Sequence, residues 1–213
     1  MSFQWIFDNA ETLSINKRPI VSQTVSRDQH VRSVSRGGAV WRFTIKMPDG
    51  KRWSEVRGLI EGIDSSNLLT PATVNLGKAA YNYIVGYRGD AVDTSTMTFK
   101  YTSAQAASDT TKFELGNMPG STGAVLFRAG DFIQPTGSTH VYSIVEDVVK
   151  GASATQLVKV NRGILETPSA TAVTMNVGSQ VQWTVICTVC PQWSLIARDI
   201  VGWNGEFQFQ EVL

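Results

Sequence analysis

Alternation of apolar and polar side chains is the dominant pattern along this chain of 213 residues. Residues 39–47 show it most clearly, because every second residue is apolar: Ala39, Trp41, Phe43, Ile45 and Met47. The longest run covers residues 181–190 and places on one face Val181, Trp183, Val185, Cys187 and Val189. Side chains of a strand point alternately to the two faces of its sheet. A period of two therefore predicts strands with one buried face.

Shorter segments of the same character predict further strands. They are residues 4–7, 20–25, 81–87, 97–101, 124–128, 141–146, 157–160, 172–176 and 206–211. Turn signals separate the segments; Pro48, Asp49 and Gly50, for example, form a tight-turn sequence directly after the strand at 39–47. Many short strands spaced by turns are typical of sandwiches and barrels. We therefore predict a mainly β fold, a β-sandwich or barrel, and a second small β subdomain stays an open alternative.

One segment has helical spacing instead. Val56, Leu59 and Ile60 recur at intervals that bring them onto one helical face, and Ser54 can cap the start of the helix. The sequence therefore predicts one short helix near residues 54–61, set among the strands.

Residues 103–123 contain few large hydrophobic side chains and include the turn-rich sequence NMPGS at 117–121. We expect this segment to be a loop or a joint. It would separate a β-rich N-terminal half, 1–102, from a β-rich C-terminal half, 124–213, with the halves packed together as one domain. Within it, residues 102–111 combine Ala and Gln with Ser, Thr and Asp, so helix and loop are equally compatible with this stretch.

Charge is sparse and unevenly distributed. Charged residues make up 17% of the chain, below the roughly 25% typical of soluble domains. Interface cores are depleted in charge, although a Ser- and Thr-rich surface on an ordinary β domain accounts for the composition equally well. Residues 1–60 hold ten basic and five acidic residues and carry a net charge of +5, while the remainder carries −4. This division suits contacts between copies and is too weak to predict specific nucleic-acid binding.

Residues 21–38 place three arginines among Ser, Gln and Val, just before the strongest strand. Guanidinium groups suit contacts with carboxylates of a partner, but charge along the edge of a solvated hairpin is an equally good interpretation. Two further cations follow in the same basic region, and near the C-terminus a tryptophan has no clear place in the strand pattern. Aromatic residues and Arg are enriched at interface hot spots. The candidate subunit contacts are Arg27, Arg32, Arg36, Lys51, Arg52 and Trp203.

The chain offers little chemistry. Its two histidines, His30 and His140, are not placed at a spacing that metals use. Cys187 and Cys190 form a CxxC sequence, but a zinc site needs a second ligand pair and a redox motif opens a helix. Here the pair falls on a predicted strand, where positions three apart point to opposite faces, so we expect Cys187 to pack in the core. We predict no catalytic site, metal or cofactor, and we expect neither a signal peptide nor a membrane span.

Two blocks resemble structural proteins of bacteriophage tails. WIFDNAE at 5–11, followed by GAVWRFT at 38–44, is similar to the opening of structural proteins of contractile-tailed phages. FRAGDFIQ at 127–134 and HVYSIVEDV at 140–148 resemble a pattern that recurs in phage tail and baseplate proteins. The ending, RDIVGWNGEFQFQE at 198–211, is similar to the close of the same group.

The resemblance implies a tail-tube or tube-initiator (distal-tail-like) subunit. Such a protein would be made in the host cytoplasm and would lie in the virion, in a ring, commonly of six copies, at the tail tube or baseplate. Its partners would be copies of itself and other tail or baseplate proteins. Three other classes stay open: a carbohydrate-binding or receptor-recognition β module, a neck or tail-completion protein and, with least support, an enzyme such as a hydrolase.

Reversing the charges of Arg27, Arg32 and Arg36 together, each to Glu, should block assembly without unfolding the protein, because the three side chains are assigned to contacts and not to the core. Incorporation into particles and the circular dichroism spectrum would be compared with those of the wild type. Normal incorporation of the triple variant would contradict the assignment.

Overall fold

A computed structural model describes residues 3–17, 21–25, 27, 31–35, 39–65, 70–76 and 95–213. The fold is mainly β, with 42% of residues in strands and 15% in helices, and it includes a curled half-barrel sheet. The predicted fold class, a β-sandwich or barrel with a short helix, is therefore confirmed. Among the described residues, no helix combines the length and the apolar character needed to cross a membrane.

The chain divides into two compact units, and the second is inserted into the first. Unit 1 combines Met1–Val74 with Thr184–Leu213, and unit 2 is Asn75–Trp183. The expected joint at 103–123 instead lies wholly inside unit 2. We expected the halves 1–102 and 124–213, but unit 1 joins the two ends of the chain instead, because the last strands pair with the first ones.

The described residues of unit 1 form two helices and the strands from both ends of the chain. Its elements are α1 (Gln4–Asp8), β1 (Thr12–Asn16), β2 (Val21–Val25), β3 (Val31–Ser35), β4 (Arg42–Lys46), β5 (Lys51–Arg52), α2 (Trp53–Ser65), β6 (Ala72–Asn75), β15 (Gln182–Val189), β16 (Gln192–Ala197), β17 (Ile200–Asn204) and β18 (Phe207–Glu211). The largest sheet has the strand order β1-β4-β18-β15-β6. β16, β17 and β5 form a second sheet, and β2 pairs with β3 in a third.

The predicted alternation in β4 and β15 corresponds to buried faces. Every alternating apolar side chain of residues 39–47 is buried, as are the first four of residues 181–190; Val189 is exposed. β18 lies between the two strands and pairs antiparallel with both, aligning Phe209 with Phe43 and Phe207 with Ile45. These pairs place aromatic and β-branched side chains opposite one another, an arrangement that stabilises sheets.

One predicted strand is wrong: residues 4–7 belong to the helix α1. Phe3 and Phe7 are four residues apart, so a helix brings both rings to one side. There they pack on Phe209 with ring centroids 5.1 and 5.2 Å away, and Phe7 also meets Phe43 edge-on at 5.4 Å. Burial of two rings on one side favours the helix over an exposed short strand.

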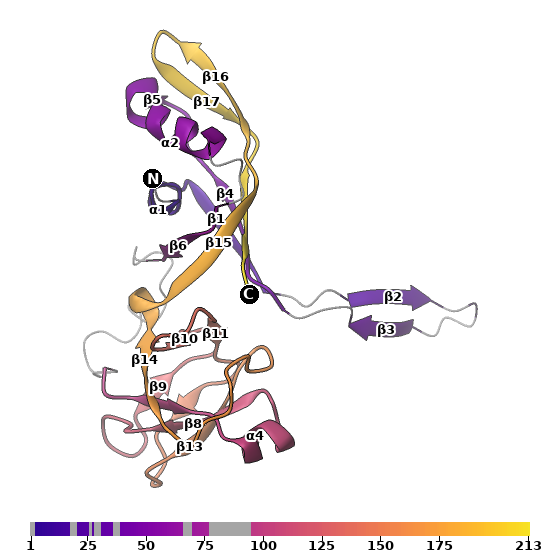
Figure 1. The fold of residues 1–213 in the computed structure, drawn as a ribbon, viewed down its shortest axis with the longest axis vertical. Helices are drawn as coiled ribbons and strands as arrows, with labels where there is room; N and C mark the ends of the chain where they lie inside the picture. The colour runs from indigo at the N-terminus through magenta and orange to yellow at the C-terminus, as the bar shows by residue number, and fades with distance from the viewer. Residues whose placement is uncertain are drawn as a thin grey trace. The chain divides into compact units, whose positions relative to one another are not determined.

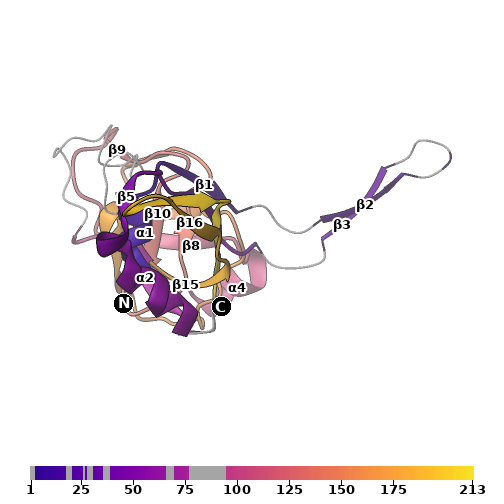
Figure 2. The same ribbon diagram turned by 90° about the horizontal axis from the view of Figure 1, so that it is seen from above.

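The predicted helix near residues 54–61 is present as α2, which extends to Ser65. Val56, Leu59 and Ile60 are buried as the spacing predicted, and Glu55 lies in the first turn, where a carboxylate interacts favourably with the helix dipole. Both α1 and α2 lie on the same side of the unit 1 strands (Figures 1 and 2).

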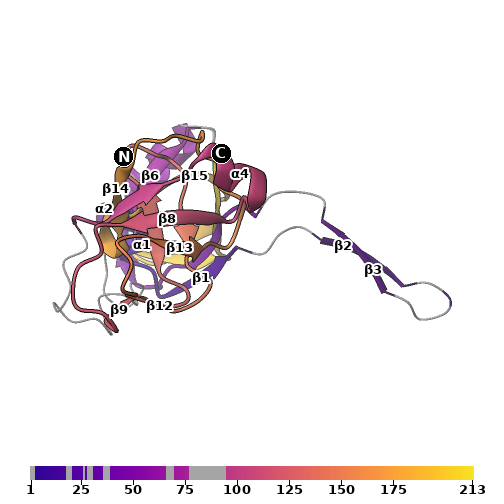
Figure 3. The same ribbon diagram turned by 90° about the horizontal axis from the view of Figure 1, so that it is seen from below.

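Unit 2 is built around a six-stranded sheet with the order β11-β10-β14-β7-β8-β13, and β9 pairs with β12 in a second sheet. Its elements are β7 (Thr98–Lys100), α4 (Ser103–Ser108), β8 (Lys112–Gly116), β9 (Val125–Phe127), β10 (Phe132–Pro135), β11 (Tyr142–Ser143), β12 (Val148–Val149), β13 (Gln156–Lys159), β14 (Val173–Val177) and the 3-10 helix η2 (Gly178–Gln180). Figure 3 shows β13 beside β8. The rings of Phe99 and Phe113 stack at 4.6 Å in a core that also includes Tyr142.

The ambiguous residues 102–111 contain a helix, α4. Thr102 caps its start: the Thr102 hydroxyl accepts from the N–H of Gln105, and the Gln105 side chain accepts from the N–H of Thr102. This capping box satisfies two helix-end donors. α4 and β8 fill much of the segment that we expected to be a loop, and the predicted strand at 81–87 lies outside the described residues.

Replacing Phe209 by Ala should lower the free energy of unfolding by about 3–5 kcal/mol, because the ring is fully buried between β4 and α1. Gln208→Ala is the matched control: this side chain is exposed on the opposite face of the same strand, and its loss should change stability by less than about 0.5 kcal/mol. Urea denaturation followed by tryptophan fluorescence measures both variants. Equal effects of the two substitutions would contradict the packing described for β18.

Candidate functional site

The β16–β17–β5 sheet of unit 1 collects half of the predicted contact residues. β17 pairs antiparallel with both neighbours and aligns Trp203 with Trp193, Val201 with Lys51, and Ile200 with Arg52. Lys51, Arg52 and Trp203, which are far apart in the sequence, are therefore brought together on one small sheet (Figure 1).

One face of this sheet is covered by α2. Val201 is fully buried against Val56 and Ile60, which lie one helical turn apart. At the start of the helix the Trp53 ring stacks on Trp193 of β16, with centroids 4.5 Å apart and ring planes 28° from parallel. The backbone N–H of Trp53 donates to the carbonyl of Asp199 at 2.7 Å. The helix thus fixes the position of the β16–β17 strand pair.

The turn after β4 ties the sheet to the rest of unit 1. Gly50 adopts a φ of +95°, which glycine accepts without strain, as the Pro-Asp-Gly sequence predicted. This turn lets the Asp49 carboxylate accept a hydrogen bond from the backbone N–H of Trp203 at 3.0 Å.

The six predicted contact residues have different surroundings. Lys51 is half-buried: its Nζ donates to Asn9 Oδ1 at 3.2 Å and lies 5.9 Å from the centroid of the Trp5 ring. Arg52 is exposed. Trp203 is half-buried, with its ring edge-on to Phe207 at 5.2 Å, so much of it packs inside unit 1.

The other three arginines belong to the β2–β3 hairpin region. Arg27 is exposed between the two strands. Arg32 lies on β3 opposite Thr24, and Arg36 lies outside the described residues. Their role in contacts stays a prediction.

β16 carries the surface feature that the sequence analysis missed. All six of its residues are exposed, including Trp193 (37%), Leu195 (53%) and Ile196 (64%), and Ile200 of β17 is 38% exposed. β16 is an edge strand, and in the part of the chain described here no strand pairs with its outer side. Exposed apolar edges of this kind readily pair with another chain. The sequence does contain a signal for these two strands: apolar and polar residues alternate over one short run before Arg198 and another after Asp199.

Gly202 allows the close packing of the two strands. A Cβ atom at this position would overlap the side chain of Ile196, which crosses the face of β17 opposite α2. The same face is flanked by the Asp49 carboxylate. We call the exposed side chains Trp193, Leu195, Ile196 and Ile200 the β16 patch.

The cysteines have a structural role, as predicted for Cys187. Its side chain is buried, its thiol donates to the carbonyl of Val189 at 3.3 Å, and burial raises the pKa of Cys187 to about 12. A thiol with this pKa is protonated at neutral pH and is a poor nucleophile. Cys187 and Cys190 are both free thiols.

Metal-binding geometry does not occur among the described residues, where no three His, Cys, Asp or Glu side chains gather in a way that could hold an ion. His30 lies outside those residues, and His140 lies in unit 2 beside Glu166. Glu146 and Asp147 are both exposed.

The chain matches no protein-family model. A search of curated proteins likewise returned no match.

Proposed function

We propose that this chain is a structural subunit of a bacteriophage tail, and that its copies form a ring at the tail tube or baseplate and stack on other tail proteins. The role is mechanical and not catalytic. The observation that carries the proposal is the β16 patch, a group of exposed apolar side chains on an edge strand and its neighbour. Exposing apolar side chains to water is unfavourable, so the patch favours contact with a partner.

A second copy of the chain is the partner that fits the patch. Exposed charges of both signs lie on the strands of the same sheet or close to them in the sequence, and we call them the rim of the patch: Arg52, Arg198, Asp199 and Glu206. A mixed-sign rim lets identical subunits attract one another, whereas a rim of one sign would favour a different, oppositely charged partner. Exposed apolar side chains accompanied by exposed charges are also found together at protein interfaces.

A closed ring requires two different, complementary surfaces on each subunit. The β2–β3 hairpin supplies the second in this proposal. It is a two-stranded sheet of its own, and an isolated hairpin is at best marginally stable in water. Val25 at the end of β2 is 68% exposed, and Arg27 beside it is exposed too. Contact with a neighbouring subunit would stabilise this hairpin and cover Val25.

The charge division noted in the sequence does not separate the two units. Unit 1 holds eleven basic and ten acidic residues, and unit 2 holds eight of each. Unit 1 adds to residues 1–60 the acids Glu61 and Asp64 and the C-terminal segment from Thr184, whose net charge is −2. Net charges of +1 and 0 therefore replace the +5 and −4. Support from electrostatics is therefore local, at the rim of the β16 patch.

Replacing Leu195 and Ile196 together by Lys should convert an oligomer into a monomer, because two buried cations at an apolar contact are strongly unfavourable. Sedimentation velocity of the purified full chain measures this at several concentrations. Leu157→Lys is the matched control, since Leu157 is equally exposed (57%) but lies on β13 of unit 2. A monomeric wild-type protein, or a double variant that assembles as the wild type does, would overturn the proposal.

The phage assignment has a separate test in the genome. Genes for other tail components beside the gene of this chain would support it. A neighbourhood of unrelated metabolic genes would contradict it.

A further inference from the structure

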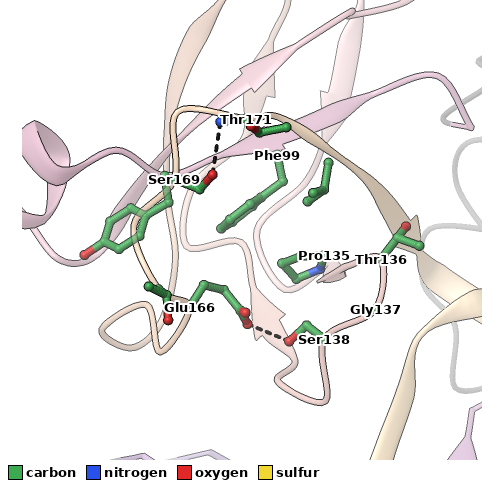
Figure 4. A pocket seen from close by; sticks show the side chains of 11 residues that line it. Phe99, Pro135, Thr136, Gly137, Ser138, Glu166, Ser169 and Thr171 are labelled. Atoms are coloured by element: carbon green, nitrogen blue, oxygen red, sulfur yellow. Dashed lines mark hydrogen bonds between the residues drawn. The ribbon is translucent and has the colours of Figure 1, made fainter.

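A cavity of about 250 Å³ opens on unit 2, whereas the surfaces proposed for assembly belong to unit 1. Three separate segments line it: Phe99 and Tyr101 at the end of β7, the turn from Pro135 to Ser138, and the stretch from Glu166 to Val173 (Figure 4). Ligand pockets in proteins usually measure about 300–1,000 Å³, so this one suits a single small ring.

The walls are held in place before any ligand arrives. Phe99 stacks on Phe113 in the core. The turn closes through a hydrogen bond from Ser138 N–H to the Pro135 carbonyl at 3.0 Å, and Gly137 has the φ of +86° that the third position of a type II turn needs. The buried amide of Gln134 donates to the carbonyl of Ser138 at 2.9 Å and fixes the turn further.

The polar lining is rich in hydroxyl groups and contains one charge. Six lining residues carry a side-chain hydroxyl: Tyr101, Thr136, Ser138, Thr167, Ser169 and Thr171. Glu166 supplies the charge, and the lining contains no Lys or Arg. An anionic ligand would be repelled by Glu166 with no cation in the lining to offset the cost.

Glu166 is organised by three neighbours that meet at one of its oxygens. Oε1 accepts from the Ser138 hydroxyl at 2.5 Å and from the Tyr142 hydroxyl at 3.3 Å, and His140 Nδ1 lies 3.0 Å away. Burial raises the pKa of Tyr142, so its hydroxyl remains a donor. Oε2 takes part in none of the hydrogen bonds between described residues, which leaves it available to a ligand hydroxyl.

We propose that this cavity binds one neutral sugar residue. Phe99 and Pro135 provide an apolar floor for its C–H groups, the rim hydroxyls exchange hydrogen bonds with its hydroxyls, and Glu166 Oε2 accepts a charge-assisted hydrogen bond from one of them. Several rim residues are exposed, so the remainder of a glycan can extend into solvent. The inference is independent of the proposed assembly.

Saturation-transfer NMR on the full chain tests the site with methyl glycosides of glucose, galactose and mannose, with N-acetylglucosamine, and with glucosamine as a cationic probe. At least one neutral sugar should bind, and an oligosaccharide ending in that residue should compete with it. Glu166→Gln should weaken binding about tenfold, because it removes the charge from the acceptor.

Thr167→Trp should abolish binding by filling the cavity mouth. This variant should fold normally, since Thr167 is exposed, and it should sediment as the wild type does. Thr155→Trp, at an exposed threonine of unit 2 outside the lining, should bind as the wild type does. Binding of glucosamine alone, binding of no probe, or unchanged binding in Thr167→Trp would overturn the proposal.

Discussion

The pairing of β18 with both β4 and β15 is the constraint on which unit 1 depends. β4 belongs to the N-terminal segment of unit 1, Met1–Val74. One of its edges pairs with β1 and the other with β18, the last strand of the chain. Phe207 and Phe209 of β18 are buried in a core that also contains Phe3, Phe7 and Phe43. The buried carboxylate of Glu211 accepts from Trp41 N–H at 3.2 Å, and Glu211 N–H donates to the Trp41 carbonyl at 2.8 Å. Burial of large aromatic side chains and a hydrogen-bonded buried carboxyl group together fix the register.

This pairing also decides how the units share the chain. Because the two ends of the sequence meet in one sheet, the 109 residues from Asn75 to Trp183 form an insertion with a core of their own. The same pairing brings β16 and β17 next to β5 and α2, where Val201 is buried and the outer strand is left apolar and exposed. The surfaces proposed for assembly therefore belong to unit 1, and the cavity proposed to bind a sugar belongs to unit 2.

Local patterns in the sequence predicted local structure well. Alternation identified β4 and β15, and helical spacing identified α2, because each buries one face over enough residues to give a clear period. Four residues are too few to separate periods of 2 and 3.6, so α1 was mistaken for a strand although Phe3 and Phe7 stand at helical spacing. β16 was missed because its alternation covers few residues and is interrupted by the adjacent apolar pair Leu195 and Ile196.

Long-range features could not be predicted in this way. The boundary between units depends on pairing between strands some 165 residues apart, as with Phe43 and Phe209. The cavity draws Phe99, Ser138 and Glu166 from three distant segments, and none of the three has a distinctive neighbourhood in the sequence. That Lys51 and Trp203 lie on one sheet likewise depends on the pairing of β5 with β17, and no motif announces it.

Electron microscopy of the purified full chain tests most directly whether copies assemble through the β16 patch. Assembly through this patch predicts closed rings of one size, with the β16–β17 strands of each subunit lying at the boundary with its neighbour. Isolated monomers, or rings in which these strands face solvent all the way round, would contradict it.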